Sequence, residues 1–142
     1  MEGENNELLL ANQLCFPLYA ASKALVRRYD ELLAPLGLTY TQYIVMLAMW
    51  ELGEATVNQI GEMVCLDSGT LSPLLNKLTS KGFLEKKVGE DKRSRLIALT
   101  SEGEALREEA RQARAKVACG LNLSEEEAKT LYRLCYKTLQ GC

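Results

Sequence analysis

Cysteine thiols are the most reactive side chains that this sequence offers, because it contains no histidine. The thiols stand at five scattered positions, which are Cys15, Cys65, Cys119, Cys135 and Cys142. No two of them form a C-x-x-C pair, which argues against a zinc ribbon or a thioredoxin-type redox motif. Without histidine there is no Cys–His or Ser–His–Asp nucleophile and no Cys2His2 zinc site. We therefore expect no metal and no cofactor, and reduced thiols at rest.

Cys15 is the candidate for a redox-sensing thiol. A sensor must be a thiolate, because the anion attacks a peroxide O–O bond and the neutral thiol does not. A free cysteine with a pKa of about 8.5 is mostly protonated at neutral pH, but Cys15 falls near the start of a predicted helix, where the backbone dipole favours an anion. Tyr19, Tyr29 and Tyr40 are the hydroxyl donors placed in the sequence to hold that anion. Without these tyrosines, Cys15 would more commonly be interpreted as a buried structural thiol.

The expected surroundings of Cys15 are apolar, which would favour an organic hydroperoxide over hydrogen peroxide as the oxidant. They are Leu8, Leu9, Leu10, Leu14, Phe16, Met46 and Met49. Of the other cysteines, Cys65 and Cys135 are expected to be packed as small hydrophobic side chains. Cys142 stands at the end of the sequence.

Positive charge gathers in one segment of an acidic chain. Residues 67–100 hold seven Lys or Arg and four Asp or Glu, so this segment carries +3 while the remainder carries −5. A basic segment on an acidic body is the asymmetry expected of a DNA reader, although a solvated basic face is the plainer interpretation.

Two short predicted helices, about 56–64 and 67–81, have helix-turn-helix proportions. The second would lie in the major groove of double-stranded DNA with its N-terminal side chains toward the base edges. The candidate DNA-binding residues on it are Asp67, Ser68, Thr70, Ser72, Asn76 and Lys77. Taken alone, these residues are equally well explained as helix-capping and surface residues.

A predicted hairpin follows, with apolar-bearing runs at about 83–88 and 95–99 around a polar tip. Lys92, Arg93 and Arg95 give that tip three cations. An arginine held out in this way can enter a narrow A·T-rich minor groove. Asp91 is expected to orient Arg93. A reader helix with a basic wing favours DNA recognition more than either feature does alone.

The hydrophobic periodicity predicts two further helices before the helix-turn-helix and two after the hairpin. The first runs from about 7 to 34 with a kink at Pro17, and ends at Pro35 and Gly37. Another runs from about 41 to 52, and two more close the chain at about 101–119 and 124–140. Capping boxes are predicted at Thr39–Gln42, Thr56–Gln59, Ser101–Glu104 and Ser124–Glu127.

The whole chain of 142 residues is predicted to form a single, mainly α domain of six helices and a β-hairpin wing. Apolar residues make up 47% and charged residues 25%, as is ordinary for a folded soluble protein. No apolar run is long enough for a membrane span, and the polar, acidic N-terminus is not a secretory signal. We expect a cytoplasmic protein.

Two stretches carry a resemblance to a known family. The reader-helix segment LDSGTLSPLL and the run from Asp91-x-Arg93 to Leu99-Thr100 resemble the MarR family of bacterial winged helix-turn-helix repressors. The N-terminal NQLCFPLYAASK is similar, more narrowly, to the organic hydroperoxide resistance regulators, the OhrR branch. The likeness extends over nearly the whole chain.

The resemblance implies an interlocked homodimer in which about 7–36 and 101–142 dimerise and about 39–100 bind a pseudo-palindromic operator. It also implies that tyrosines matching Tyr29 and Tyr40 reach Cys15 from the partner subunit. Oxidation would give a sulfenic acid. Either a low-molecular-weight thiol or Cys119 of the other subunit would then resolve it, and the DNA would be released.

Two alternatives remain open from the sequence. One is a MarR-type repressor whose effector is a small aromatic ligand in the dimer crevice, with Cys15 inert. The other is an enzyme, a thiol peroxidase, although no paired catalytic arginine with Thr or Ser stands near Cys15. The sequence does not specify the operator, the regulated genes or the natural oxidant.

Overall fold

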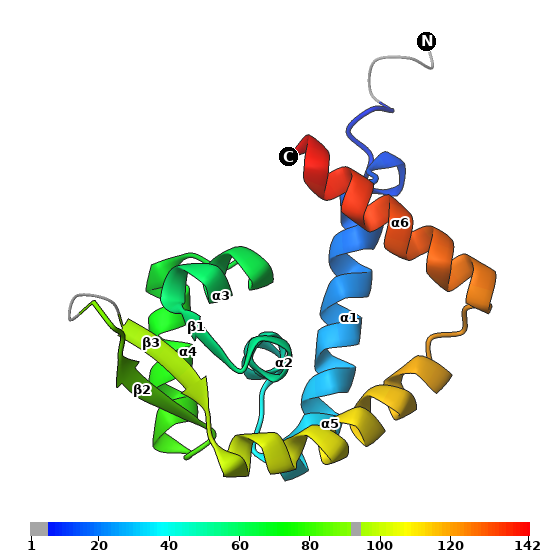
Figure 1. Ribbon diagram of the computed structural model, residues 1–142. Coiled ribbons are helices and arrows are strands. Elements are labelled where there is room, and N and C mark those ends of the chain that lie inside the picture. The colour runs from blue at the N-terminus through cyan, green and yellow to red at the C-terminus, as the bar shows by residue number, and fades with distance from the viewer. Residues whose placement is uncertain (1–5, 92–94) are drawn as a thin grey trace.

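The computed structural model describes residues 6–91 and 95–142, which form six α-helices, two short 3-10 helices and one sheet. In chain order they are η1 Leu10–Asn12, α1 Cys15–Leu33, η2 Ala34–Leu36, α2 Tyr40–Leu52, β1 Glu54–Thr56, α3 Val57–Val64, α4 Ser68–Ser80, β2 Leu84–Val88, β3 Arg95–Leu99, α5 Ser101–Cys119 and α6 Glu125–Gly141. Figure 1 shows α2, α3, α4 and the sheet gathered into one body, from which α1, α5 and α6 extend. The predicted mainly α winged helix-turn-helix is confirmed.

The first helix begins at Cys15, eight residues later than the sequence predicts. The Gln13 side-chain amide donates to the Glu7 carbonyl at 2.5 Å and to the Leu9 carbonyl at 3.0 Å, which favours the short η1 turn instead. The predicted kink at Pro17 is wrong, because Pro17 lies in the first turn of α1, where its missing N–H has no helical partner to lose.

Pro35 and Gly37 end the first helix as predicted. Gly37 adopts a φ of 76°, a left-handed conformation that favours glycine, and the chain then turns into α2. Within residues 6–91 and 95–142, no single helix is long and apolar enough to cross a membrane. Cys15–Leu36 and Tyr40–Leu52 reach that length and apolarity only when taken together, and they are bent by 72°.

The sheet has three antiparallel strands in the order β1-β3-β2, where the sequence predicts only the β2–β3 hairpin. The missed strand β1 places Ala55 opposite Ile97 and Thr56 opposite Leu96. Three residues are too few to show an alternating pattern, so β1 gives no periodicity to detect. Its pairing positions the start of α3 against the wing.

The core lies between α2, the helix-turn-helix and the sheet. Its fully buried side chains include Leu33, Met46, Met49, Ile60, Leu71, Leu78, Leu84 and Ile97. The Trp50 indole N–H donates to the Gly103 carbonyl at 2.8 Å, which joins this core to α5. More than half of α2 is buried, as expected of a helix that is apolar on most of its faces.

Three of the four predicted capping boxes are present. They are Thr39–Gln42, Thr56–Gln59 and Ser124–Glu127. The prediction of Ser101 as a cap is wrong, because Thr100 caps α5. Its hydroxyl accepts the Gly103 N–H at 3.0 Å and donates to the Gly82 carbonyl at 2.5 Å. This second bond, to the turn before β2, selects Thr100 over its neighbour.

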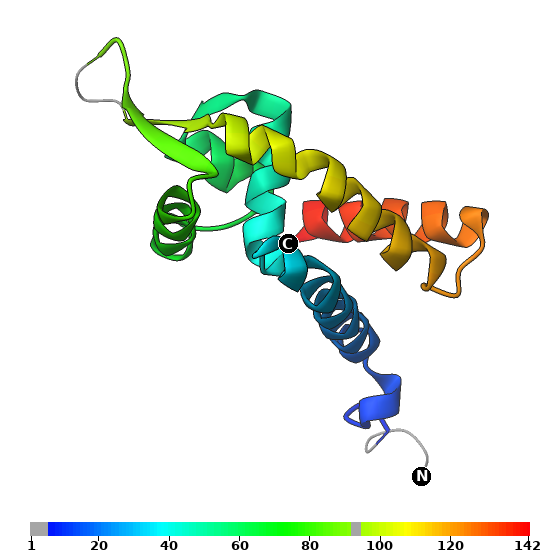
Figure 2. The ribbon, with the colours of Figure 1, turned by 90° about the horizontal axis from the view of Figure 1, so that it is seen from below.

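α6 has no buried residue. Figure 2 shows it at an angle to α1 rather than along it. The prediction that Cys135 is a core residue is therefore wrong, since the helix that carries it does not bury that face within the chain. Cys65 is exposed as well, contrary to the prediction that it is packed.

Candidate nucleic-acid interface and thiol site

The turn between α3 and α4 is tight. Cys65 ends α3 with a left-handed φ of 57°, and the Leu66 N–H returns to the Gly61 carbonyl at 3.0 Å. A Cβ at position 61 would lie 2.8 Å from the Leu66 carbonyl oxygen, so the turn requires glycine there. Asp67 then caps α4 by accepting the Thr70 N–H at 2.8 Å. These backbone hydrogen bonds lower the pKa of Asp67 below its ordinary value.

The structure places the other predicted reader residues on the exposed surface of α4. They are Ser68, Thr70, Ser72, Asn76 and Lys77. Asp67 is exposed too, but its carboxylate is engaged in the cap. Polar side chains in the first two turns of an exposed helix are suited to contact base edges and phosphates.

A small hollow of about 190 Å³ lies between α4 and the wing. Ser72 and Asn76 line it from α4, and Lys86 and Arg95 line it from the strands. The Lys86 ammonium donates to the Asn76 side-chain oxygen at 2.6 Å. Sequence reasoning missed Lys86 as an individual residue, because only its charge, and not its place opposite α4, can be read from the sequence.

The tip of the wing is only partly described. Lys92 and Arg93 lie outside the described residues. Asp91 and Arg95 flank that gap and are both exposed. Arg95 is the first residue of β3 and pairs with Val88 of β2.

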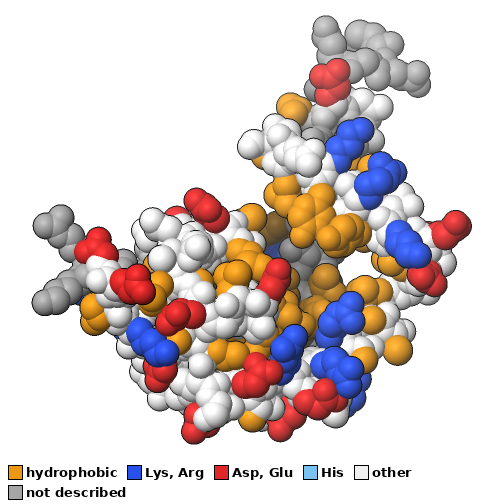
Figure 3. All heavy atoms as spheres, viewed as in Figure 1, with side chains coloured by type: hydrophobic (Ala, Val, Ile, Leu, Met, Phe, Trp, Pro, Cys, Tyr) orange, Lys and Arg blue, Asp and Glu red, His pale blue; other side chains and the backbone are white. Residues whose placement is uncertain are grey.

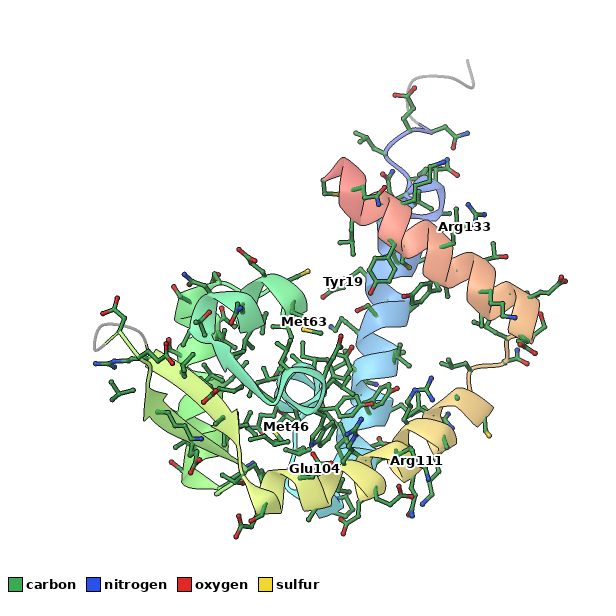
Figure 4. All side chains as sticks on the ribbon, viewed as in Figure 1. Tyr19, Met46, Met63, Glu104, Arg111 and Arg133 are labelled. Carbon is green, nitrogen blue, oxygen red and sulfur yellow. The ribbon has the colours of Figure 1, made fainter. Side chains whose placement is uncertain are left out.

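Cys15 is the first residue of α1, and its thiol is free and exposed. Tyr19 follows one helical turn later and is 60% exposed. The Lys23 ammonium lies 5.1 Å from the centre of the Tyr19 ring. Figure 4 shows Tyr19 on the upper half of α1, well separated from Met46 inside the core.

Tyr29 and Tyr40 lie together within a larger aromatic cluster. Their ring centres are 5.3 Å apart, and Tyr43, which sequence reasoning missed, lies 5.3 Å from Tyr29 and 6.3 Å from Tyr40. Trp50 extends the cluster at 6.4 Å from Tyr43. Burial, followed by the charge of Tyr29, raises the pKa of Tyr40 and raises the pKa of Tyr43 to about 12. The raised pKa values keep the Tyr40 and Tyr43 hydroxyl groups protonated at neutral pH.

One chain does not bring Cys15 to these rings. Tyr29 follows Cys15 by fourteen residues on the same continuous helix, a separation of about 21 Å along its axis. Only Tyr19 of the three predicted donors lies near Cys15 within the chain.

Cys119 is the last residue of α5, and its thiol is also free and exposed. Arg28 holds this end of α5 against α1 by donating to the Lys116 carbonyl at 3.4 Å. Because Arg28 is thirteen residues from Cys15 on α1, or about 20 Å, Cys15 and Cys119 of one chain stand too far apart for a disulfide.

The expected apolar surroundings of Cys15 need correction at two positions. Met46 and Met49 have no exposed surface and belong to the core around α2. Four leucines of the list, Leu8, Leu9, Leu10 and Leu14, and also Phe16, are at least 41% exposed. These five side chains surround the start of α1 and are not covered within the chain.

A second hollow, of about 360 Å³, lies between α2 and α5. Tyr43, Leu47 and Trp50 give it an apolar wall, and three arginines of α5 line its other side. They are Arg107, Arg111 and Arg114. Arg107 and Arg111 are each already paired with a glutamate of the preceding turn of α5.

Comparison with known proteins identifies relatives of the whole chain. Residues 27–110 match the family described as transcriptional regulator SarA/Rot. The organic hydroperoxide resistance transcriptional regulator of Bacillus subtilis is 39% identical over 141 residues, which is 99% of this chain and 96% of that protein. The HTH-type transcriptional regulator SarZ of Staphylococcus aureus is 39% identical over 123 residues, covering 86% of this chain and 83% of that protein.

Solved structures show the same architecture. Reduced AbfR bound to DNA is 34% identical, with a TM-score of 0.80 and coverage of 96% of both chains. A crystal structure of AbfR of Staphylococcus epidermidis is 33% identical, with a TM-score of 0.78 and coverage of 96% of this chain and 95% of that chain. The disulfide form of AbfR is less similar, with a TM-score of 0.68.

Proposed function

This chain belongs to the SarA/Rot family of MarR-like winged-helix transcriptional regulators, which are not enzymes, and we propose that it is a peroxide-sensing repressor. It binds a pseudo-palindromic operator as a homodimer in the cytoplasm and releases it when an organic hydroperoxide oxidises Cys15. The observation that carries the proposal is the exposed Cys15 thiol at the start of α1, in a chain 39% identical to an organic hydroperoxide regulator over nearly its whole length.

The proposed DNA interface consists of α4 and the wing. α4 enters the major groove with Asp67, Ser68, Thr70, Ser72, Asn76 and Lys77 along its exposed face. Lys92, Arg93 and Arg95 of the wing reach the neighbouring minor groove, with Asp91 orienting Arg93. A relative of the same fold, AbfR, is solved bound to DNA, which supports DNA binding by α4 and the wing of this chain.

Dimerisation through about 7–36 and 101–142 is supported by the apolar surface that these helices leave uncovered. Leu14 is 79% exposed, Leu131 46%, Leu134 45% and Leu139 58%. Figure 3 shows hydrophobic side chains lining the hollow between the extending helices and the compact body. A second copy of the chain would cover this surface. The DNA-binding parts of the two copies, about 39–100 in each, would then hold their reader helices one helical turn of DNA apart.

The proposed chemistry begins with the Cys15 thiolate. Its sulfur attacks the outer oxygen of the hydroperoxide, an S–O bond forms, the O–O bond breaks, and the alkoxide leaves as an alcohol after taking a proton. A second thiol then attacks the sulfenic acid and releases water, which forms a disulfide. Before oxidation, the thiolate accepts hydrogen bonds from the hydroxyl groups of Tyr19 and of Tyr29 and Tyr40 from the partner subunit. Oxidation of the sulfur breaks these hydrogen bonds.

Operator binding before and after one equivalent of an organic hydroperoxide tests the switch. Wild type should release the DNA on oxidation, and Cys15→Ser should keep it. Cys65→Ser is the matched control, because it removes another exposed thiol of the chain and should behave as wild type. Release by the Cys15→Ser variant would refute sensing at Cys15.

One observation favours a second candidate, a repressor that responds to a small aromatic ligand. The hollow between α2 and α5 combines aromatic walls with guanidinium groups, a composition suited to an aromatic carboxylate. An aromatic carboxylate that releases the operator equally from wild type and Cys15→Ser, in the absence of oxidant, would establish this candidate in place of the redox switch.

A further inference from the structure

The C-terminal end of α4 is tied to the start of α2 by one lysine. Lys81, the residue that caps α4, donates through its ammonium to the Gln42 side-chain oxygen at 3.1 Å and to the Gly37 carbonyl. Gln42 is 3% exposed, and it is the one polar side chain classed as buried in the described parts of the chain. A buried amide of this kind is costly to leave without its partners, so its bonds hold the two segments in one arrangement.

The same amide is part of the structure that holds Tyr40. The Gln42 side-chain oxygen also accepts the Thr39 N–H at 3.2 Å, which completes the capping box at the start of α2. Tyr40 is the first residue of α2, and its own N–H donates to the Asp30 carboxylate of α1 at 2.7 Å. Hydrogen bonds therefore connect α1, the first turn of α2 and the end of the reader helix.

We infer that Gln42 and Lys81 are positioning residues that transmit displacement of Tyr40 to the reader helix. This inference rests on the proposed function, in which Tyr40 loses its bond to the Cys15 sulfur on oxidation. When the first turn of α2 shifts, the Gln42 oxygen shifts with it. Lys81 then pulls the end of α4 or loses its buried partner, and both outcomes disturb the alignment of α4 with the groove.

The alternative is that Lys81 only stabilises the fold. Measuring operator affinity in the reduced and the oxidised state distinguishes this structural role from transmission. Gln42→Met removes the acceptor with little change of volume and leaves the Lys81 charge in place. Lys81→Met removes the donor. Gln59→Met is the control, because it deletes the equivalent capping-box bond of α3, from the Thr56 N–H at 2.9 Å, where no lysine is attached.

The expected effect appears in the ratio of the oxidised to the reduced Kd for the operator. In wild type and Gln59→Met this ratio should reach about 100, within the usual range of coupling between two sites. In Gln42→Met and Lys81→Met it should fall below about 10, with the reduced Kd of Gln42→Met within about threefold of wild type. Equal ratios of about 100 in all four proteins would overturn the inference and leave the proposed function standing.

A second measurement does not depend on oxidation. Asp30→Ala frees the first turn of α2, and amide hydrogen exchange is followed at Gly82 and Phe83, whose N–H groups bond to Thr79 and Leu78 at the end of α4. Relative to the Leu99 amide of the sheet, exchange at these positions should rise at least about fivefold with Lys81 present and less than about twofold in a Lys81→Met background. Equal acceleration in both backgrounds would refute transmission through Lys81, even if wild type proved not to respond to peroxide.

Discussion

Gly103 occupies a position in α5 that has no room for a side chain. A Cβ there would lie 2.2 Å from the Phe83 carbonyl oxygen and 2.8 Å from a Leu99 methyl group. We expect Gly103→Ala to lower the free energy of unfolding by about 2 kcal/mol or more, because backbone atoms must move. Gly141→Ala is the control, since nothing lies within 4 Å of its added Cβ. Thermal unfolding at one fixed protein concentration measures both, and equal midpoints would contradict the expectation.

Asp67 makes the stability of α4 depend on acid pH. Its hydrogen bonds to the first turn of α4 lower its pKa in the folded state, so its contribution is present above the unfolded pKa of about 4 and is lost as the pH falls through the lower folded value. Asp67→Asn keeps a capping side chain without the charge. We expect the urea midpoint of wild type to fall more steeply below about pH 4 than that of Asp67→Asn.

Glu62→Gln is the control for this titration, because it removes an exposed carboxylate from the neighbouring helix α3 without touching a cap. Its urea midpoint should follow the acid dependence of wild type. If Asp67→Asn also followed wild type, the lowered pKa of Asp67 would contribute nothing measurable to folding.

At the residue scale, local sequence patterns identify helix caps and reactive residue types. Which side chains become neighbours depends instead on how the helices pack. Cysteine can be singled out as the reactive residue type because few residue types perform its chemistry, and Asp67 can be identified because it precedes an apolar helical pattern. The place of Tyr43 among the other rings depends on how α1 and α2 cross. Met46 and Met49 were misplaced beside Cys15 for the same reason, since periodicity does not show which neighbour covers an apolar helix.

Among the elements, α5 offers the sharpest test of a cap, because two neighbouring residues both have suitable side chains. Thr100 binds the Gly103 N–H and the Gly82 carbonyl. The Ser101 hydroxyl donates to the exposed Glu102 carboxylate, at 3.3 Å. We expect Thr100→Ala to cost about 1 kcal/mol or more of unfolding free energy and Ser101→Ala less than about 0.5 kcal/mol. Chemical denaturation of the two variants measures the difference, and the reverse order would show that Ser101 is the cap in solution.

Element boundaries follow from the sequence where two local signals agree. The bounds of α3 were predicted to within one residue, since a capping box and a short apolar repeat indicate the same segment. The start of α1 was not, because the choice between helix and η1 depends on the Gln13 amide bonds. β1 was missed because its identity as a strand comes from its partner β3 and not from its own three residues.

For the whole molecule, the uncovered face of α6 predicts how the dimer can be dissociated. Leu131→Glu places a charge on that face, and we expect the dimer dissociation constant to rise at least about tenfold, as loss of one buried leucine would suggest. Lys137→Glu is the control, because six residues further on it points about 120° away around the helix. Sedimentation equilibrium measures both, and an unchanged constant for Leu131→Glu would remove α6 from the interface.

The separation of Cys15 and Cys119 within one chain turns the fate of the oxidised thiol into a question about the assembly. If Cys119 resolves the sulfenic acid, the disulfide must join two subunits, because about 20 Å of α1 separates the two sites in each chain. We expect oxidised wild type to run as a covalent dimer on a non-reducing gel and Cys119→Ser to run as a monomer. Cys142→Ser removes a different exposed thiol and should still form the dimer.

A covalent dimer that persists in Cys119→Ser would assign resolution to another cysteine. A monomeric oxidised wild type that still releases DNA would assign it to a low-molecular-weight thiol, whose mixed disulfide mass spectrometry would detect on Cys15.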